Sequence, residues 1–381
     1  MKKIFFFLFL ISFLFESNAQ IQNPRKLEFD WKTDTLITNI DLSEITMVLP
    51  RGRFPKIDFP KFIDKEEGLT SFFALEPVLS VEIDGVAKAY PFNMLSSHEM
   101  SNDTIGGVPI LPTYCPLCNT GIVFDRRLEI NGKTEVLEFE VSGLLRKSNM
   151  IMFDRNTETW WQQLMGNAIV GDLTNKELEI IPSLIISVED FFEKYPDGQI
   201  LSKKTGHERA EASYGKNHYV KYDSLGHDPY SRYFKPEDID MRFPAMERIV
   251  NLYSDGAYKI YPFSILKDKS VINDCFNSKC IVIFHDFGTV SVLDKKEISE
   301  SQDIGTVTMF SPIVDGKKRT FIKKGDKFFD KKTKSTWDLT GLCIEGKLKG
   351  KQLNIEPYSI HFAFAWLAFN PESVVYGEGK D

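Results

Sequence analysis

Two cysteines of this chain have a spacing that points directly to chemistry. Residues 113–125 read TYCPLCNTGIVFD, in which Cys115 and Cys118 form a C-x-x-C pair around Pro116. Such a pair binds a metal ion through thiolates, cycles between dithiol and disulfide, or forms a plain structural disulfide. In thioredoxin-like proteins the pair begins a helix. Here strand-like residues lie on both sides, so we favour a metal-binding turn, and the other two readings stay open.

Copper is the metal that the surrounding residues favour. His98 precedes the turn, and Met150 and Met152 alternate along a predicted strand, so they share one face. Thiolate, imidazole and thioether groups together suit Cu(I). We therefore predict a copper site formed by Cys115, Cys118, His98 and Met152. Core packing is the plainer role for the methionines.

Zinc is the less favoured metal, because a closed structural zinc site needs four ligands. Cys275 and Cys280 form a second pair, spaced C-x-x-x-x-C, and Cys343 stands alone. No pattern in the sequence brings these residues to the C-x-x-C turn. How the three of them pair stays open.

Four further residues are candidates to support the site: Glu99, Tyr114, Asp125 and Trp161. Glu99 directly follows His98, so on a helix their side chains diverge by about 100°. Glu99 would then orient a neighbour or act as a base rather than bind the same ion. The chain has no G-x-S-x-G, P-loop or H-E-x-x-H motif. We therefore expect no nucleotide cofactor, and whether the protein is an enzyme stays open.

Two functions other than metal binding remain open. The first is a thiol-disulfide oxidoreductase, with Cys115 as the nucleophile and Cys118 as the resolving thiol. A C-x-x-C disulfide closes a small ring, and such disulfides are usually redox-active. The second is a non-catalytic module that binds a ligand in a groove. The partner we expect is an envelope redox protein or a metallochaperone.

The first 19 residues predict a secretory signal peptide. Two lysines precede an apolar stretch at residues 4–15, which is too short to span a bilayer comfortably. Ser17, Asn18 and Ala19 form a small-x-small cleavage signal, so the mature chain would start at Gln20. No later segment is long and apolar enough to cross a membrane. We expect an exported protein, periplasmic or secreted, without a transmembrane segment after cleavage.

The composition predicts a globular protein that is large enough for two domains. Hydrophobic residues make up 42% of the chain and aromatic residues 13%. The net charge of −7 argues against nucleic acid as a partner, because nucleic-acid binders are generally basic.

The two halves of the sequence resemble each other. DGVAKAYPFNML from Asp84 matches DGAYKIYPFSIL from Asp255, and FDRNTETWW from Phe153 matches FDKKTKSTW from Phe329. The second copy has neither the C-x-x-C pair nor the His-Glu pair. This asymmetry predicts that the first half carries the site and that the second half is a structural partner.

The remaining pattern predicts mostly strands with short helices. A strand hairpin surrounds Asp84 and Gly85, strands flank the cysteine turn, and Ser187 and Asp190 begin a helix in the manner of a capping box. The predicted segments are a signal peptide (1–19), an N-terminal lead-in (20–70), a first repeat (71–205), a Tyr- and His-rich connecting loop (206–245) and a second repeat (246–381). We expect a strand-rich α+β fold of two tandem duplicated units packed with pseudo-twofold symmetry.

Residues 84–127, from DGVAKAYPF through TYCPLC to FDRR, resemble a bacterial family catalogued as domain of unknown function 3179. Its pattern combines AYP, HE-x-x-ND, GG-x-P and TYCPLC segments. The later runs VSGLL, MFDR and WQQ of this chain also fit that pattern, as does the lead-in FPKIDFPKF. The chain departs from it at Ser97, where the family tends to have an aromatic residue.

The resemblance spans nearly the whole chain after the signal peptide. It implies an exported or envelope-associated bacterial protein. It also groups His98, Glu99, Cys115 and Cys118 as one unit, and it brings no established activity.

Overall fold

The computed structural model of the protein describes residues 31–378. It is strand-rich, with 40% strand and 15% helix in several mostly antiparallel sheets, which confirms the predicted strand-rich character. The predicted signal peptide, residues 1–19, lies outside the described residues. Among the helices of the described part, none has the length and apolar character needed to cross a bilayer.

A long hairpin forms the centre of the first sheet. β3 (Pro77–Ile83) and β4 (Val86–Pro91) pair antiparallel, which confirms the predicted hairpin. The turn residues Asp84 and Gly85 have φ angles of 52° and 80°, as a tight two-residue hairpin turn requires. The sheet order is β14 (Leu184–Ser187), β3, β4, β15 (Gln199–Leu201) and β2 (Phe62–Ile63).

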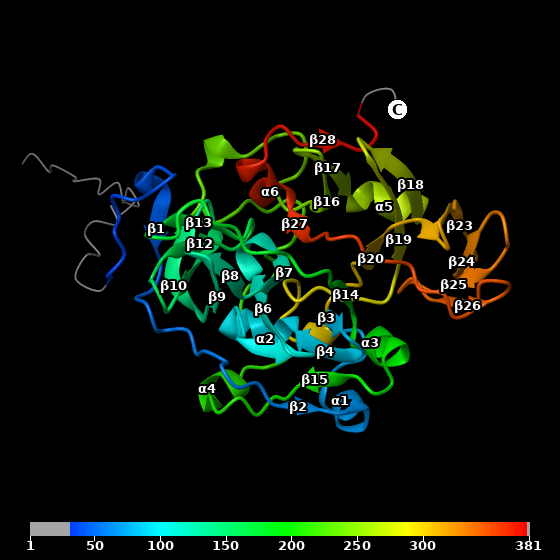
Figure 1. Ribbon diagram of the computed structural model, residues 1–381, viewed down its shortest axis with the longest axis horizontal. Helices are drawn as coiled ribbons and strands as arrows, with labels where there is room; N and C mark the ends of the chain where they lie inside the picture. Colours follow the sequence, from blue (N-terminus) through cyan, green and yellow to red (C-terminus); the bar gives the residue numbers. More distant parts are fainter. Residues whose placement is uncertain (1–30, 379–381) are drawn as a thin grey trace, which may run out of the picture.

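A three-stranded antiparallel sheet carries the cysteine pair. Its strands, in spatial order, are β5 (Asp103–Ile105), β6 (Val108–Cys115) and β7 (Thr120–Asp125). The short 3-10 helix η3 (Pro116–Cys118) joins β6 to β7, so strands flank the cysteine turn as predicted. Helix α2 (Phe92–His98) leads from β4 towards β5 and contacts β6 (Figure 1).

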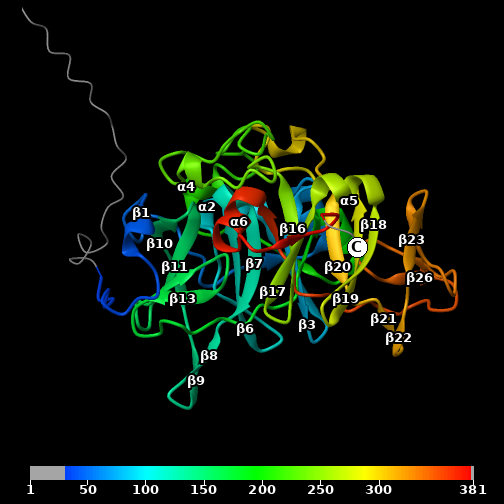
Figure 2. The ribbon, with the colours of Figure 1, turned by 90° about the horizontal axis from the view of Figure 1, so that it is seen from above.

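A further five-stranded sheet lies at one end of the molecule (Figures 1 and 2). Its order is β1 (Ile45–Met47), β10 (Phe139–Arg146), β11 (Asn149–Asp154), β12 (Trp160–Gln162) and β13 (Asn167–Val170). The ribbon of β8 (Arg127–Ile130) and β9 (Lys133–Val136) projects away from the body in Figure 2.

Glycine is required at one position of β10. Gly143 has a φ of 79° and lies where the strand register shifts, and a Cβ there would collide with the Leu49 carbonyl oxygen. Instead the Val48 N–H donates to the Gly143 oxygen at 2.9 Å. This close approach fastens the N-terminal lead-in to the sheet.

The second half of the chain contains sheets of similar order. A four-stranded sheet consists of β27 (Ile360–Phe362), β16 (Arg248–Ser254), β17 (Ala257–Pro262) and β28 (Val374–Val375). A three-stranded sheet consists of β18 (Val271–Phe276), β19 (Lys279–Asp286) and β20 (Thr306–Phe310). A four-stranded sheet at the other end of the molecule (Figure 1) consists of β23 (Phe321–Lys324), β24 (Lys327–Asp330), β25 (Thr336–Trp337) and β26 (Cys343–Glu345). A separate two-stranded sheet consists of β21 (Ile313–Val314) and β22 (Lys317–Lys318).

The helices are short, and α3 begins where the sequence predicts. In α3 (Val188–Lys194), the Ser187 side chain accepts from the Asp190 N–H at 3.1 Å, which confirms the predicted capped start. The other helices are α1 (Lys65–Ser71), α4 (Glu208–Glu211), α5 (Phe263–Lys269) and α6 (Ala363–Phe369), with 3-10 turns η2 (Leu42–Glu44), η4 (Pro236–Asp238) and η5 (Ile298–Glu300).

The halves share one hydrophobic core, to which strands of both contribute. β27 of the second half contacts β7 of the first, directly after the cysteine turn. There Thr120 Oγ1 and His361 Nδ1 are 2.9 Å apart, and the Ser359 hydroxyl donates to the Gly121 oxygen at 2.8 Å. The sheet that carries the cysteines is therefore packed against, and hydrogen-bonded to, strand β27 and the residues just before it in the second half.

Candidate functional site

The cysteine turn is a single 3-10 turn between two strands. Cys115 ends β6, Cys118 ends η3, and Asn119 follows in the left-handed conformation with a φ of 51°. Pro116 suits the first position of such a turn, because its fixed φ is already helical. Thr120 begins β7 and donates its hydroxyl hydrogen to the Cys118 oxygen at 3.2 Å. This arrangement holds both sulfurs on one short, rigid segment.

Both cysteines of the turn are buried free thiols. Cys115 is 1% exposed and Cys118 is fully buried. The pairing that the sequence left open is settled for the other three cysteines, since Cys275 and Cys280 form a disulfide and Cys343 is free and buried.

The two thiols differ in acidity. Burial raises the pKa of Cys115, but hydrogen bonds from the Cys118 thiol and from the N–H groups of Met150, Cys118 and Leu117 outweigh it, so its net pKa lies below the ordinary value. Burial, the hydrogen bond that it donates and the negative charge of Cys115 raise the pKa of Cys118 well above the ordinary value. The pair therefore favours a Cys115 thiolate beside a Cys118 thiol.

Glu99 is a buried carboxyl group whose charge interacts with Cys115. It ends α2 in the left-handed conformation with a φ of 60°, and its carbonyl accepts from the Tyr114 N–H at 2.8 Å. The left-handed backbone turns the Glu99 side chain out of the helical path, and the carboxyl group lies close enough to Cys115 for the two charges to interact. Burial and the charge of Cys115 raise the pKa of Glu99 well above its usual range. This upward shift favours the protonated, uncharged form of the carboxyl group.

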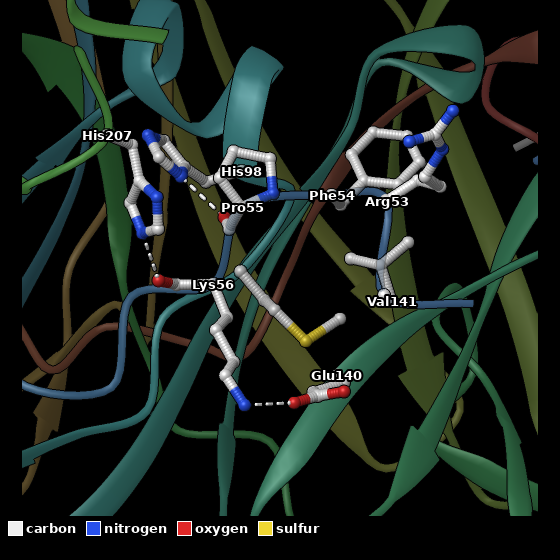
Figure 3. Close-up of a pocket in the computed structure, with 10 residues that line it drawn as sticks. Arg53, Phe54, Pro55, Lys56, His98, Glu140, Val141 and His207 are labelled. Carbon is white, nitrogen blue, oxygen red and sulfur yellow. Dashed lines mark hydrogen bonds and ion pairs between the residues drawn. The ribbon is translucent and has the colours of Figure 1, made fainter. Parts of the chain in front are cut away.

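His98 occupies a different pocket from the cysteines. Its Nδ1 lies 2.6 Å from the Pro55 oxygen, and its Nε2 lies 2.5 Å from the Tyr214 hydroxyl. With His207, whose ring centroid is 5.6 Å away, it lines a cavity of about 440 Å³ beside the lead-in (Figure 3). Desolvation by burial is the main cause that lowers the pKa of His98 to about 4. Both ring nitrogens are thus engaged away from the thiols.

The methionines lie in the core that also contains the thiols. Met150 and Met152 are both fully buried on β11, whereas Ile151 between them belongs to a separate, smaller core on the other face of that sheet. The Met150 N–H is one of the donors to Cys115. Met152 pairs in register with Trp161 of β12. The two thioethers therefore share one face of the strand, as the alternation predicts.

A buried amide network next to the turn is absent from the sequence prediction. Asn149 donates to Gln163 at 2.9 Å and accepts from Gln162 at 2.6 Å. Gln163 in turn donates to the Thr113 hydroxyl at 2.9 Å, on the strand that leads to Cys115. Asn149 also hydrogen-bonds the Cys118 thiol. The available signal was three side-chain amides, Asn149 at the start of β11 and Gln162 and Gln163 at and just after the end of β12.

Of the other predicted supporting residues, one lies at the turn. Tyr114 stacks on Phe92 with ring centroids 4.2 Å apart, and its hydroxyl donates to Asn119 at 3.2 Å. Asp125 lies at the far end of β7. Trp161 donates from Nε1 to an Asp154 carboxylate oxygen at 2.9 Å. The hydrogen bonds of Asp125 and Trp161 therefore go to neighbouring residues of the sheets, Arg127 and Asp154.

The connecting loop covers the cysteine turn. Tyr222 is 1% exposed and donates its hydroxyl hydrogen to the Leu117 oxygen at 3.1 Å. Tyr230 stacks on it with centroids 4.8 Å apart. A cavity of about 340 Å³ lies beneath the loop, and Glu99 and Leu117 form part of its wall. The rest of the lining includes Val48, Phe54, Val141, Leu145, His218, Tyr219, Tyr230, Arg232 and Tyr233.

A buried ion pair closes the site on the other side of the loop. Arg248 of β16 donates to an Asp223 carboxylate oxygen at 2.7 Å and to the Ser291 hydroxyl at 3.1 Å. Arg248 and Asn119 line the same small cavity behind the turn. Loop and second half are therefore fastened together beside the cysteines. No sequence motif predicts the ion pair between Arg248 and Asp223.

The chemistry available to this arrangement is that of thiols and a proton donor. Within residues 31–378, no group of three or more His, Cys, Asp or Glu side chains could hold a metal ion. What the structure does bring together is a pair of buried thiols, of which Cys115 has the lowered pKa and Cys118 the raised one, and a buried carboxyl group, Glu99, whose pKa is raised. The class defined by fold and site is a strand-rich α+β protein with a buried dithiol.

Residues 51–373 match the family model described as "Protein of unknown function (DUF3179)", and the chain belongs to this family. The resemblance noted in the sequence is thereby confirmed. No curated protein and no solved structure matches the chain.

Proposed function

We propose that Cys115 and Cys118 form the redox-active dithiol of a thiol-disulfide oxidoreductase. The observation that carries this proposal is geometric: two buried free thiols lie at the two ends of one 3-10 turn, and Leu117 of that turn lines a cavity together with Glu99. The lowered pKa of Cys115 and the raised pKa values of Cys118 and Glu99 agree with this geometry. A nucleophilic cysteine needs to be a thiolate, and a resolving cysteine needs to keep its proton until the first step is complete.

The reaction begins when the Cys115 thiolate attacks one sulfur of a substrate disulfide. A mixed disulfide forms at Cys115, and the other substrate sulfur leaves as a thiolate, which takes the Glu99 proton. The Glu99 carboxylate then accepts the proton of Cys118. The Cys118 thiolate attacks the Cys115 sulfur and expels the second substrate thiolate. Two electrons have passed from the protein to the substrate, and a Cys115–Cys118 disulfide remains.

The cavity beneath the connecting loop is the proposed entry for the substrate. Its wall includes Glu99 and Leu117, and its aromatic lining suits an apolar or aromatic group attached to the disulfide. Because Cys115 is buried, the loop that holds Tyr222 has to open before the sulfurs meet. We therefore expect the reaction rate to depend on this opening.

Trapping of the mixed disulfide tests the assignment of roles. The reduced Cys118→Ser variant is treated with a small aromatic disulfide, and adducts are located by peptide mass mapping. We expect the adduct at Cys115. Cys115→Ser should give none at Cys118, and Cys343→Ser, which removes a buried thiol elsewhere, should react as the wild type does. Equal adduct formation at Cys118 in the Cys115→Ser variant would contradict the roles.

Copper binding is a second candidate, favoured by the position of the methionines. Met150 and Met152 are buried in the same core as the two thiols, and thiolates with thioethers suit Cu(I). Cys115 and Cys118 would hold the ion. The predicted ligand His98 would first have to give up its contacts with Pro55 and Tyr214.

Competition with a Cu(I) chelator tests this second candidate. If the reduced protein binds one Cu(I), Cys115→Ser should abolish binding and Met152→Leu should weaken it. His98→Ala should change nothing if the ring keeps its present partners, and should weaken binding if the ring is a ligand. Failure of the reduced wild type to compete for Cu(I) would remove the candidate.

We further infer that the two halves arose by duplication and that the second half is the structural partner. Matching contacts support this inference. Lys88 pairs with Asp103 and Lys259 with Asp274, each at 2.8 Å. The turn after α5 also repeats the turn after α2: Ser270 has a φ of 56°, close to that of Glu99. Its carbonyl accepts the His285 N–H at 2.8 Å, as that of Glu99 accepts the Tyr114 N–H.

We also propose that the protein is exported after cleavage behind Ala19. The basic and apolar start of the chain supports this proposal, and so does the Cys275–Cys280 disulfide, because disulfides persist in oxidising compartments. Cell fractionation with N-terminal sequencing tests it. A mature protein that starts at Gln20 in the exported fraction is expected. An intact Met1 in the cytoplasmic fraction would contradict the proposal.

A further inference from the structure

The Cys275–Cys280 disulfide lies in the open, unlike the buried cysteines. The two residues face each other across the antiparallel pair β18 and β19, with Cα atoms 4.0 Å apart. Cys275 is exposed and Cys280 is half-buried. An exposed disulfide is open to attack by thiols, whereas structural disulfides are generally sheltered in the interior.

Lys318 of β22 holds its ammonium group against both sulfurs. Its Nζ lies 2.8 Å from the Cys275 sulfur and 3.1 Å from the Cys280 sulfur. Among the described residues no carboxylate pairs with Lys318, so its charge is directed at the disulfide. A neutral disulfide that only cross-links hairpin strands is not stabilised by a cation at this place. A thiolate that forms there is stabilised by the Lys318 ammonium group.

We propose that Cys275–Cys280 is a second thiol-disulfide exchange site, at the surface, that reacts with low-molecular-weight anionic thiols. Lys318 acts in two ways: it attracts the incoming thiolate and it stabilises the thiolate that leaves. The neighbouring Lys317 is also exposed and adds positive charge to the same strand. This site is independent of the proposed redox role of Cys115 and Cys118.

The exchange balances as follows. An external thiolate attacks the exposed Cys275 sulfur, the bond between the two protein sulfurs breaks, and Cys280 leaves as a thiolate beside the Lys318 ammonium. A second external thiolate attacks the external sulfur of the mixed disulfide and releases Cys275 as a thiolate. The protein gains two electrons and becomes a dithiol, and the two external thiols become one disulfide.

Three small two-carbon thiols with an anionic, a neutral and a cationic end group test the proposal. In a Cys115→Ser/Cys118→Ser background, the loss of the Cys275–Cys280 disulfide is followed by quenching, alkylation and peptide mapping. The thiols are mercaptoethanesulfonate, mercaptoethanol and cysteamine, compared at equal thiolate concentration. We expect the anionic thiol to react fastest and the cationic thiol slowest.

Lys318→Met should slow the reaction with the anionic thiol about five-fold and flatten the charge dependence. Lys317→Met is the matched control, because it removes an equal charge from the adjacent residue, and it should have a smaller effect. The proposal is overturned if the two variants react alike, or if the native disulfide reacts no faster than the same disulfide in the urea-unfolded chain. Because the background lacks Cys115 and Cys118, neither result bears on the buried dithiol.

Discussion

At the scale of single residues, the neighbours of each thiol decide its role. Burial raises the pKa of Cys115, but the neighbouring Cys118 thiol and the backbone N–H groups of Met150, Cys118 and Leu117 lower it by more. The Cys118 thiol is the donor towards Cys115, and this raises the pKa of Cys118. Its own thiolate form has no comparable stabilisation. The pKa values of the two thiols therefore shift in opposite directions, although both residues have the same side chain and nearly the same burial.

Glu99→Gln tests the proton transfer at this scale. Glutamine keeps the shape of the side chain but cannot give or take the proton, so resolution of the mixed disulfide at Cys115 should slow about 100-fold. Stopped-flow reaction with an aromatic disulfide separates this step from the first attack. Glu135→Gln, on the exposed strand β9, is the control. An unchanged rate of resolution in Glu99→Gln would exclude the carboxyl group from the mechanism.

Glu76 gives a prediction about stability and pH. Burial raises its pKa to about 8, and Asn93 hydrogen-bonds its carboxyl group. Because the folded pKa lies above the unfolded one, the stabilisation is complete below pH 4.5 and is lost as the pH rises to about 8.

Relative to Glu76→Gln, the wild type should lose about 1.4 kcal/mol of unfolding free energy per pH unit in that range. Urea titrations of both proteins between pH 5 and 7.5 measure this difference. A constant difference over the range would show that Glu76 is already ionised in the folded protein.

At the scale of elements, local signals predicted the local structure. The Asp84–Gly85 turn, the capped start of α3 at Ser187 and the strands around the cysteine turn depend on neighbouring residues alone, and all were predictable. The direction of the His98 side chain was not predictable from neighbouring residues. It depends on where helix α2 ends: Glu99 is its left-handed cap, and His98, the last helical residue, faces Pro55.

The connecting loop illustrates the same limit. Its tyrosines are visible in the sequence, but their partners are distant in the chain. Tyr222 meets Leu117, and Asp223 meets Arg248. No local pattern specifies such contacts, so the sequence predicts an aromatic loop without predicting what it covers. The amide network around Asn149 escaped prediction for the same reason.

Tyr222→Phe tests whether the loop controls access to the dithiol. The variant loses the hydrogen bond to the Leu117 oxygen, worth about 0.5–1.5 kcal/mol, so the open state should become roughly 2- to 12-fold more populated. Alkylation of Cys115 should accelerate by the same factor. Tyr253→Phe, at an exposed position of β16, is the control. Equal alkylation rates in both variants would argue against the loop as the gate.

At the scale of the whole molecule, the second half supports the first. The cysteine sheet is backed by β27 through the contacts of Thr120 with His361 and of Gly121 with Ser359. A single core runs through both halves. The second half, which lacks the cysteine pair, therefore contributes to the packing of the sheet that carries it.

The shared core predicts that both halves unfold together. Hydrogen exchange in increasing urea should give β7 and β19 the same unfolding free energy. Ser359→Ala leaves the Gly121 oxygen unsatisfied and should lower both values by about 1–3 kcal/mol. Ser224→Ala, at an exposed loop position, should leave them unchanged. Separate transitions for the two strands would mean that the halves are independent domains.

The central claim is that Cys115 and Cys118 form a reversible disulfide in the folded protein. The most direct measurement equilibrates the native protein in a series of thiol-disulfide redox buffers, followed by acid quenching, alkylation and peptide mapping. We predict a Cys115–Cys118 disulfide that forms and disappears reversibly, with a midpoint of about −120 to −270 mV, the range of thiol-disulfide oxidoreductases. Two thiols that stay reduced across the whole series, while Cys275–Cys280 responds normally, would contradict the claim.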